Sequence, residues 1–219
     1  MTKRKMNFFV LLCYFIVIVF LVYIFSTYIF NSPRNAGAAT EKRLIAHFPW
    51  AIWETFLYVH ILTGAIALII GPLQFLNQSR KNIQFHRTLG KIYVISIFIS
   101  VPEGVYLAFY ATGGIGSTFG FLLLDIIWFY TTFTALKRIK ERDIIGHQEW
   151  MLRSYAATFV FVTFRLFMPI FVFAIGLGFK VGFPFAILTS IAVNLSIAEW
   201  YLRKKRKTIA GINPQSLHS

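Results

Sequence analysis

The sequence predicts an all-α integral membrane bundle of six transmembrane helices with both termini in the cytoplasm. Its 219 residues are 57% hydrophobic and 14% charged, whereas a soluble domain is about 45–50% apolar and about 25% charged. Six apolar segments reach the length of about 20 residues that a spanning helix needs. The basic residues, which give a net charge of +14, gather in alternate connections between these segments. A soluble enzyme, a disordered protein and a disulfide-rich secreted domain are therefore excluded.

The first predicted span, Asn7–Phe30, carries no charge and follows a basic start at Lys3–Lys5. A cleaved signal peptide with small residues near Ala36 is the alternative. Its apolar region would be about 7–15 residues long, and this run is longer, so a retained helix is favoured. The single cysteine, Cys13, lies in this run and cannot form an internal disulfide.

The second span, Trp50–Phe75, begins at tryptophans typical of a membrane interface. On it His60, Gly64, Ala67 and Gly71 share one helical face. Small residues on such a face let another helix approach closely. This face is therefore expected to point into the bundle.

The third span, Gly90–Ala111, and the fourth, Phe119–Leu136, each hold one acid in an apolar run. The fifth, Trp150–Leu177, carries Arg165 on a helical face that begins at Ser154. The last span is expected as Val181–Leu202, directly before a basic tail. The expected organisation is an N-terminal helix with an outer loop (1–47), a five-helix membrane domain (48–202) and a basic cytoplasmic tail (203–219).

The distribution of Lys and Arg predicts the orientation. Most of the 22 basic residues fall in four segments that the positive-inside rule assigns to the cytoplasm. A bacterial cell membrane with anionic inner-leaflet lipids is the expected setting and partner, and a homo-oligomer is a further expectation. A nucleic-acid partner is not expected, because the positive charges are scattered over short links. The four segments contain Lys3, Arg4 and Lys5; Arg80, Lys81, Arg87 and Lys91; Lys137, Arg138, Lys140 and Arg142; and residues 203–207.

Polar side chains inside the spans are the candidate functional residues. A charged side chain at membrane depth costs about 2.5–3.5 kcal/mol on insertion scales and usually faces the bundle interior. Counting about 1.5 Å per residue, two groups are expected. The outer-half group contains His60, Glu103, Asp125 and Arg165, with Glu54 at a similar depth but round the helix from His60. The inner group contains His86, His147, Arg153, Tyr155, Asn194 and Glu199.

Each of these residues also has a structural interpretation. Arg165 and Asp125 would form an ion pair, His60 would hydrogen-bond across helices, and Glu54 would lie at the interface. Glu199 would pair with Arg153. The convergence of several costly groups at two depths favours the functional interpretation.

Six short motifs occur together in one order, and their combination resembles the bacterial membrane-protein family called domain of unknown function 2306. They are His60-x3-Gly64, Gly71 to Phe75, His86 to Tyr93, His147 to Ala156, Thr163-Phe-Arg165 and Asn194-x4-Glu-Trp200. The resemblance covers about Phe48–Leu202. It implies a polytopic bundle with His60, His86, His147, Arg153, Arg165, Asn194 and Glu199 at its characteristic polar positions, and it supplies no established reaction.

Four functions remain open from the sequence. The leading one is ion- or proton-coupled transport of a small molecule, because three acids against one arginine favour a cation or a shared proton. The alternative is a membrane redox protein that binds b-type haem through histidine. A metal-dependent or lipid-directed enzyme would use His60, Glu103 and Asp125 as ligands. A structural or assembly factor would use the polar groups only to hold helices together.

Overall fold

The computed structural model describes residues 8–36, 39, 41–76 and 81–212. Every element in these ranges is helical, and six helices are long and apolar enough to cross a membrane. The predicted six-span helical bundle is thus confirmed. Some residues used in the sequence predictions lie outside the described ranges. They are the basic residues Lys3–Lys5 and Arg80, the first residue of the predicted first span (Asn7), and the end of the tail (213–219).

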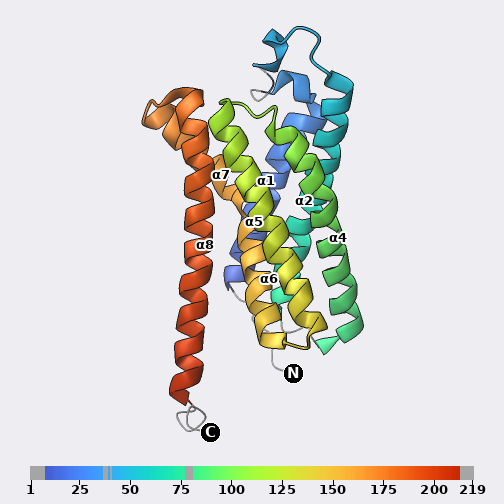
Figure 1. The fold of residues 1–219 in the computed structure, drawn as a ribbon, viewed down its shortest axis with the longest axis vertical. Helices are drawn as coiled ribbons and strands as arrows, with labels where there is room; N and C mark the ends of the chain where they lie inside the picture. Colours follow the sequence, from blue (N-terminus) through green and yellow to red (C-terminus); the bar gives the residue numbers. More distant parts are fainter. Residues whose placement is uncertain (1–7, 37–38, 40, 77–80, 213–219) are drawn as a thin grey trace.

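The helices alternate in direction between two ends of the bundle (Figure 1). α1 (Phe8–Phe25) continues as a π-helical turn, η1 (Ser26–Phe30), and leads into the short helices η2 (Pro33–Asn35) and η4 (Lys42–Leu44) at the top of Figure 1. We call this end, with residues 33–36, 39 and 41–48, the cap end. The opposite end, where α8 finishes, is called the basic end.

Three long helices follow the cap segment: α2 (Trp50–Phe75), α4 (Ile83–Ala108) and α5 (Ile115–Lys140). α4 starts earlier than expected because Asn82 caps it, its side chain accepting a hydrogen bond from the backbone N–H of Phe85. α5 begins after two glycines with positive φ, Gly113 and Gly114, a conformation that glycine adopts without strain.

The fifth span is one continuous run in sequence but a broken helix in the structure. α6 (Ile144–Thr158) is capped by Asp143, which accepts from the N–H of Gly146 at 2.8 Å. The chain then breaks at Phe159 and continues as α7 (Val160–Pro169) and a π-helical turn, η5 (Ile170–Ala174).

The last helix, α8 (Gly178–Ile212), extends past the predicted end at Leu202, so the first part of the predicted tail is helical. It lies along one side of the bundle in Figure 1 and packs mainly against α7, α5 and α6.

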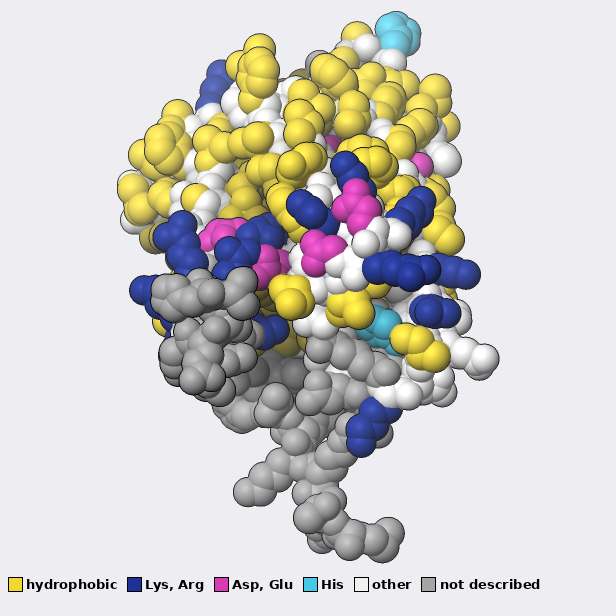
Figure 2. All heavy atoms as spheres, turned by 60° about the horizontal axis from the view of Figure 1, so that its bottom comes forward, with side chains coloured by type: hydrophobic (Ala, Val, Ile, Leu, Met, Phe, Trp, Pro, Cys, Tyr) yellow, Lys and Arg dark blue, Asp and Glu magenta, His cyan; other side chains and the backbone are white. Residues whose placement is uncertain are grey.

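The core lies between α2, α4, α5 and α6, whose neighbouring pairs make the most extensive contacts. Tyr93 and Trp128 are fully buried at its centre. Large apolar side chains such as Phe15 and Ile126 are exposed on the outside, as expected for a surface that faces lipid. At the basic end, Lys and Arg side chains gather below this apolar surface (Figure 2).

Candidate functional site

A cavity of about 190 Å³ opens among α1, α2, α4, α5 and α7 in the half of the bundle next to the cap end. A single water takes about 10–15 Å³ of such a space, so the cavity has room for a small molecule. Its lining is largely apolar and rich in aromatic rings. The polar side chains that line it include Tyr28, Lys42, His60, Tyr110, Asp125 and Arg165.

His60 enters the cavity from α2 with a fixed ring. Its Nδ1 lies 2.9 Å from the carbonyl oxygen of Ser100 on α4 and 3.0 Å from the hydroxyl of the same residue. A carbonyl only accepts hydrogen bonds, so Nδ1 carries the proton and the neutral ring keeps Nε2 as an acceptor. The ring also packs edge-on against Phe161, with 5.5 Å between the ring centroids.

Asp125 enters the cavity from α5 and is 3% exposed. Its carboxyl group lies on Gly104 of α4, where a Cβ would stand 2.8 Å from both carboxyl oxygens. Its Oδ2 is buried and has no hydrogen-bond partner among the described residues. A buried polar atom in that state costs about 1–3 kcal/mol, and a charged one costs more. A bound proton, cation or hydrogen-bond donor would therefore stabilise the Asp125 carboxyl group.

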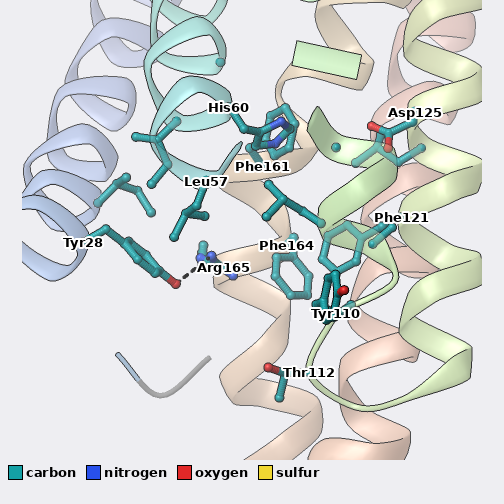
Figure 3. A pocket seen from close by; sticks show the side chains of 18 of the residues that line it. Tyr28, Leu57, His60, Tyr110, Thr112, Phe121, Asp125, Phe161, Phe164 and Arg165 are labelled. Atoms are coloured by element: carbon teal, nitrogen blue, oxygen red, sulfur yellow. Dashed lines mark hydrogen bonds between the residues drawn. The ribbon is translucent and has the colours of Figure 1, made fainter. Parts of the chain in front are cut away.

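Arg165 enters from α7 and has neutral neighbours. It donates to the hydroxyl of Tyr28 at 3.5 Å (Figure 3), and its guanidinium lies 5.0 Å from the ring centroid of Phe164. The alternative of an Arg165–Asp125 ion pair is wrong, because the ion pairs among the described residues do not include it. In Figure 3 the two side chains lie apart.

Lys42 reaches the cavity from η4 in the cap and is 4% exposed. Its Nζ lies 5.2 Å from the ring centroid of Trp53 on α2. Burial lowers the pKa of Lys42 to about 8, against the opposite effect of the neighbouring Glu41. Glu41 itself accepts a hydrogen bond from the N–H of Gly113 at 3.2 Å and so ties the cap to the α4–α5 link.

The other two acids of the cap-end half do not line the cavity. Glu54 forms a two-pronged ion pair with Arg34, at 2.7 and 3.0 Å, and Arg34 also lies over Trp50. This agrees with the interfacial interpretation of Glu54. Glu103 does not line the cavity. Its Oε2 is buried and has no hydrogen-bond partner among the described residues. Of the predicted outer-half group, the cavity thus brings together His60, Asp125 and Arg165 but not Glu103.

The predicted inner group is distributed over helix–helix contacts instead of one cavity. The expected ion pair is present: Arg153 of α6 holds Glu199 of α8 through two hydrogen bonds, at 2.5 and 3.1 Å. Arg153 stacks on Trp150 at 4.6 Å, and Glu149 pairs with Arg206 of α8. These contacts fasten α6 to α8 at the basic end.

Asn194 of α8 bridges the break in the fifth span. Its side-chain NH₂ donates to the carbonyl oxygen of Ala156 in α6 and to the hydroxyl of Thr163 in α7, each at 3.1 Å. Carbonyls in the last turn of a helix lack a partner within the helix. Asn194 therefore satisfies one that the break leaves.

The remaining inner residues also join helices. His147 places Nδ1 2.9 Å from the carbonyl oxygen of Ala135 on α5, and His86 lies near the start of α4. Tyr155 donates to the carbonyl oxygen of Leu68 at 3.4 Å. Its ring covers Gly71, where a Cβ would stand 2.1 Å from two ring carbons. The Gly71 of the sequence motif is thus the position that admits this tyrosine.

A buried hydroxyl network lies between these residues and the cavity. The hydroxyl of Tyr93 bonds those of Ser154 and Thr158, at 2.9 and 3.0 Å. Trp128 donates to Thr158 at 2.8 Å, and Thr132 bonds Ser154 at 2.7 Å. The network satisfies its members and holds α4, α5 and α6 together.

The structure assembles no metal-ligand cluster from the described part of the chain, since no three His, Cys, Asp or Glu side chains gather there. The proposed ligand set of His60, Glu103 and Asp125 is divided, because Glu103 lies outside the cavity. For b-type haem, two facing histidines are the usual axial ligands. The histidines expected at one inner level are His86 and His147. His147 places Nδ1 against the carbonyl oxygen of Ala135, and His86 lies near the start of α4.

Comparison with known proteins yields one match. The profile of the family described as "Predicted membrane protein (DUF2306)" matches residues 57–202, from the second span to the end of the predicted sixth. No curated protein and no solved structure matches.

Proposed function

The chain belongs to the family of predicted membrane proteins DUF2306, and we propose that this member binds a small amphipathic molecule in the cap-end cavity and moves it across the membrane together with a proton or another ion. One observation carries the proposal: Asp125 is a buried carboxyl group in an apolar cavity, with an oxygen that has no hydrogen-bond partner among the described residues.

The chemistry of Asp125 supports coupling to a proton or cation. An ionised carboxylate in this place pays a desolvation penalty, and Asp125 has no ion-pair partner among the described residues. Binding of a proton removes the charge, and binding of a cation offsets it. Either event changes the charge of the cavity. The binding free energy of a ligand in the same cavity therefore depends on whether the proton or cation is bound, and the reverse also holds.

His60 offers a second acceptor in the same cavity. Its Nδ1 is held by Ser100, which leaves Nε2 as the acceptor of the neutral ring. The aromatic lining supplies the apolar surface that small-molecule sites use, with a few polar groups to fix orientation. No observation favours haem in the same way.

The orientation is part of the proposal. Lys and Arg gather at the basic end, so we place that end in the cytoplasm of a bacterial cell, against anionic lipid. The cavity and its cap then lie in the outer half of the membrane. A reporter fused to the C-terminus that is active only outside the cytoplasm would stay inactive; activity would contradict this orientation.

Transport is tested in proteoliposomes with two radiolabelled probes, 3-phenylpropionate and 3-phenylpropylamine, under an imposed pH gradient. We expect the protein to accelerate uptake of at least one probe above that of protein-free vesicles, and Asp125→Asn to remove the acceleration. Glu141→Gln is the matched control, because Glu141 is an exposed acid in ion pairs beyond α5. Equal uptake by the wild type, Asp125→Asn and protein-free vesicles would contradict the proposal.

A further inference from the structure

We propose that the molecule bound in the cavity is a small organic anion, with a compact anionic group such as a carboxylate at Arg165 and Lys42 and an apolar body that extends toward Asp125. The inference rests on the proposed function and specifies its ligand class. It starts from the charges that line the cavity, which are two cations, Lys42 and Arg165, and one acid, Asp125.

This balance is the reverse of the one that depth along the sequence predicts. Three acids against one arginine favour a cation. In the structure Arg34 binds Glu54, and Glu103 does not line the cavity, whereas Lys42 enters it from the cap. Among the described residues, the cavity is therefore lined by one acidic and two basic side chains, which favours a ligand with a negative charge.

The surroundings of Arg165 point to an anion more directly. A guanidinium has five N–H donors in a planar fork that matches a carboxylate. Arg165 donates to one neutral hydroxyl, that of Tyr28, and faces one ring, that of Phe164. All eight Asp and Glu residues of the chain belong to its described part, and none of them forms an ion pair with Arg165. A bound carboxylate would supply the partner that the bundle does not provide.

The position of Lys42 supports the same end of the cavity. Lys42 belongs to the cap segment, and Tyr28, which contacts Arg165, belongs to the turn that leads into that segment. Lys42 therefore reaches the cavity from the cap, and Arg165 reaches it from α7 beside a residue that leads into the cap. Thr112 marks the α4–α5 link at the same end in Figure 3. An anion entering from the cap end meets both cations before it meets Asp125.

The other end of the cavity suits the apolar body. Phe161 lies beside His60 (Figure 3), and Phe121 of α5, the helix that carries Asp125, also lines the cavity. A body on these rings keeps the anionic group away from the carboxyl of Asp125. With a proton on Asp125, the anion and the two cations remain as the charges of the occupied cavity. The proton and the anion would then occupy the cavity together.

The test measures saturable binding of three labelled probes that share one body: 3-phenylpropionate, 3-phenylpropan-1-ol and 3-phenylpropylamine. The full chain is held in lipid nanodiscs, and binding to empty discs is subtracted. We expect the carboxylate to bind at least about tenfold more tightly than the alcohol, as one charge-assisted contact implies. Arg165→Gln should reduce that preference to less than about twofold.

Two further variants keep the test independent of folding. Arg165→Lys retains the charge without the fork, so an intermediate preference is expected. Arg43→Gln is the control, since Arg43 contacts the backbone of Arg34 in the cap and does not line the cavity. Thermal unfolding of each variant in nanodiscs identifies loss of structure.

The outcomes separate this inference from the function on which it rests. Tighter binding of the alcohol or the amine, or a carboxylate preference that persists in a folded Arg165→Gln protein, overturns the anion and leaves transport standing. Absence of saturable binding for all three probes overturns both.

Discussion

Gly104 sets the position of the Asp125 carboxyl group, and the substitution Gly104→Ala tests this without removing a charge. A Cβ at position 104 would stand 2.8 Å from both carboxyl oxygens and 3.0 Å from their carbon. Ordinary van der Waals contact begins at 3.4 Å. The carboxyl group must therefore retreat from α4 by several tenths of an ångström, and its side chain leaves the orientation in which it lines the cavity.

The stability change combines two opposite effects. Alanine favours a helix interior over glycine by about 1 kcal/mol, while overpacking costs about 1–3 kcal/mol. The net loss should be about 0–2 kcal/mol, small enough for the protein to fold. Proton-coupled uptake should fall at least about tenfold, because displacement by a fraction of an ångström disturbs a positioned group strongly.

Gly64→Ala is the matched control. Gly64 also lies in a helix and lines the same cavity, but a Cβ there meets nothing within 4 Å. We expect equal or slightly higher thermal stability and uptake within about twofold of the wild type. The assay is vesicle uptake of the labelled probes beside thermal unfolding in nanodiscs. Equal uptake by the two alanine variants would refute the assigned role of Gly104 and of the carboxyl position.

Three other predictions concern single side chains. The affinity for the carboxylate probe should fall by about tenfold as pH rises through about 8, because Lys42 loses its proton there. In a titration from pH 7 to 9, Lys42→Met should bind the probe weakly at pH 7 and show no such fall in affinity. Tyr93→Phe removes a hydroxyl shared by two partners and should lower unfolding free energy by about 1 kcal/mol, with probe binding unchanged in the same preparation. Glu199→Gln breaks the ion pair with Arg153. Because the Glu199 side chain is 40% exposed and that of Arg153 14%, the loss should cost about 0.5–1 kcal/mol, measured as a lower unfolding temperature.

The direction in which affinity changes with pH follows from the charge of Lys42. Lys42 is charged below a pH of about 8 and neutral above it, so the attraction for an anion is present at neutral pH and lost in alkali. Affinity that stays constant to pH 9 in the wild type would contradict the placement of the anion. The other titratable side chains that line the cavity are Tyr28, His60, Tyr110, Asp125 and Arg165. Glu41 precedes Lys42 in the cap.

The spans could be predicted from the sequence because length and hydropathy decide which segments cross a bilayer. The break at Phe159 could not, because residues on both sides of it belong to one uninterrupted apolar run. Helix ends were misplaced where side chains decide them, as at Asn82 and Asp143, whose caps lie in polar stretches before the apolar runs.

The cavity could be predicted in part. His60, Asp125 and Arg165 are recognisable because ionisable groups at membrane depth are costly. Depth alone does not give the direction of a side chain around the helix. Glu103 and Gly104 are adjacent, yet a helix turns about 100° per residue, so Gly104 lines the cavity and Glu103 does not.

Lys42 and Tyr28 were missed for a different reason. Lys42 enters the cavity from the cap, where no long helical period indicates which side chains point inward. Tyr28 lies near the end of the predicted first span, whose uniformly apolar sequence indicates no inward face. The available signal was weak: Lys42 is one of few basic residues on the predicted outer side. Its burial depends on how the cap folds over Trp53, which hydropathy does not describe.

Asn194 has a consequence for motion within the fifth span. One amide nitrogen holds both sides of the break, Ala156 below it and Thr163 above it. Rotation of that amide away from α6 and α7 would release both partners together. The angle between α6 and α7, and with it the position of Arg165, therefore depends in part on one side chain of a third helix.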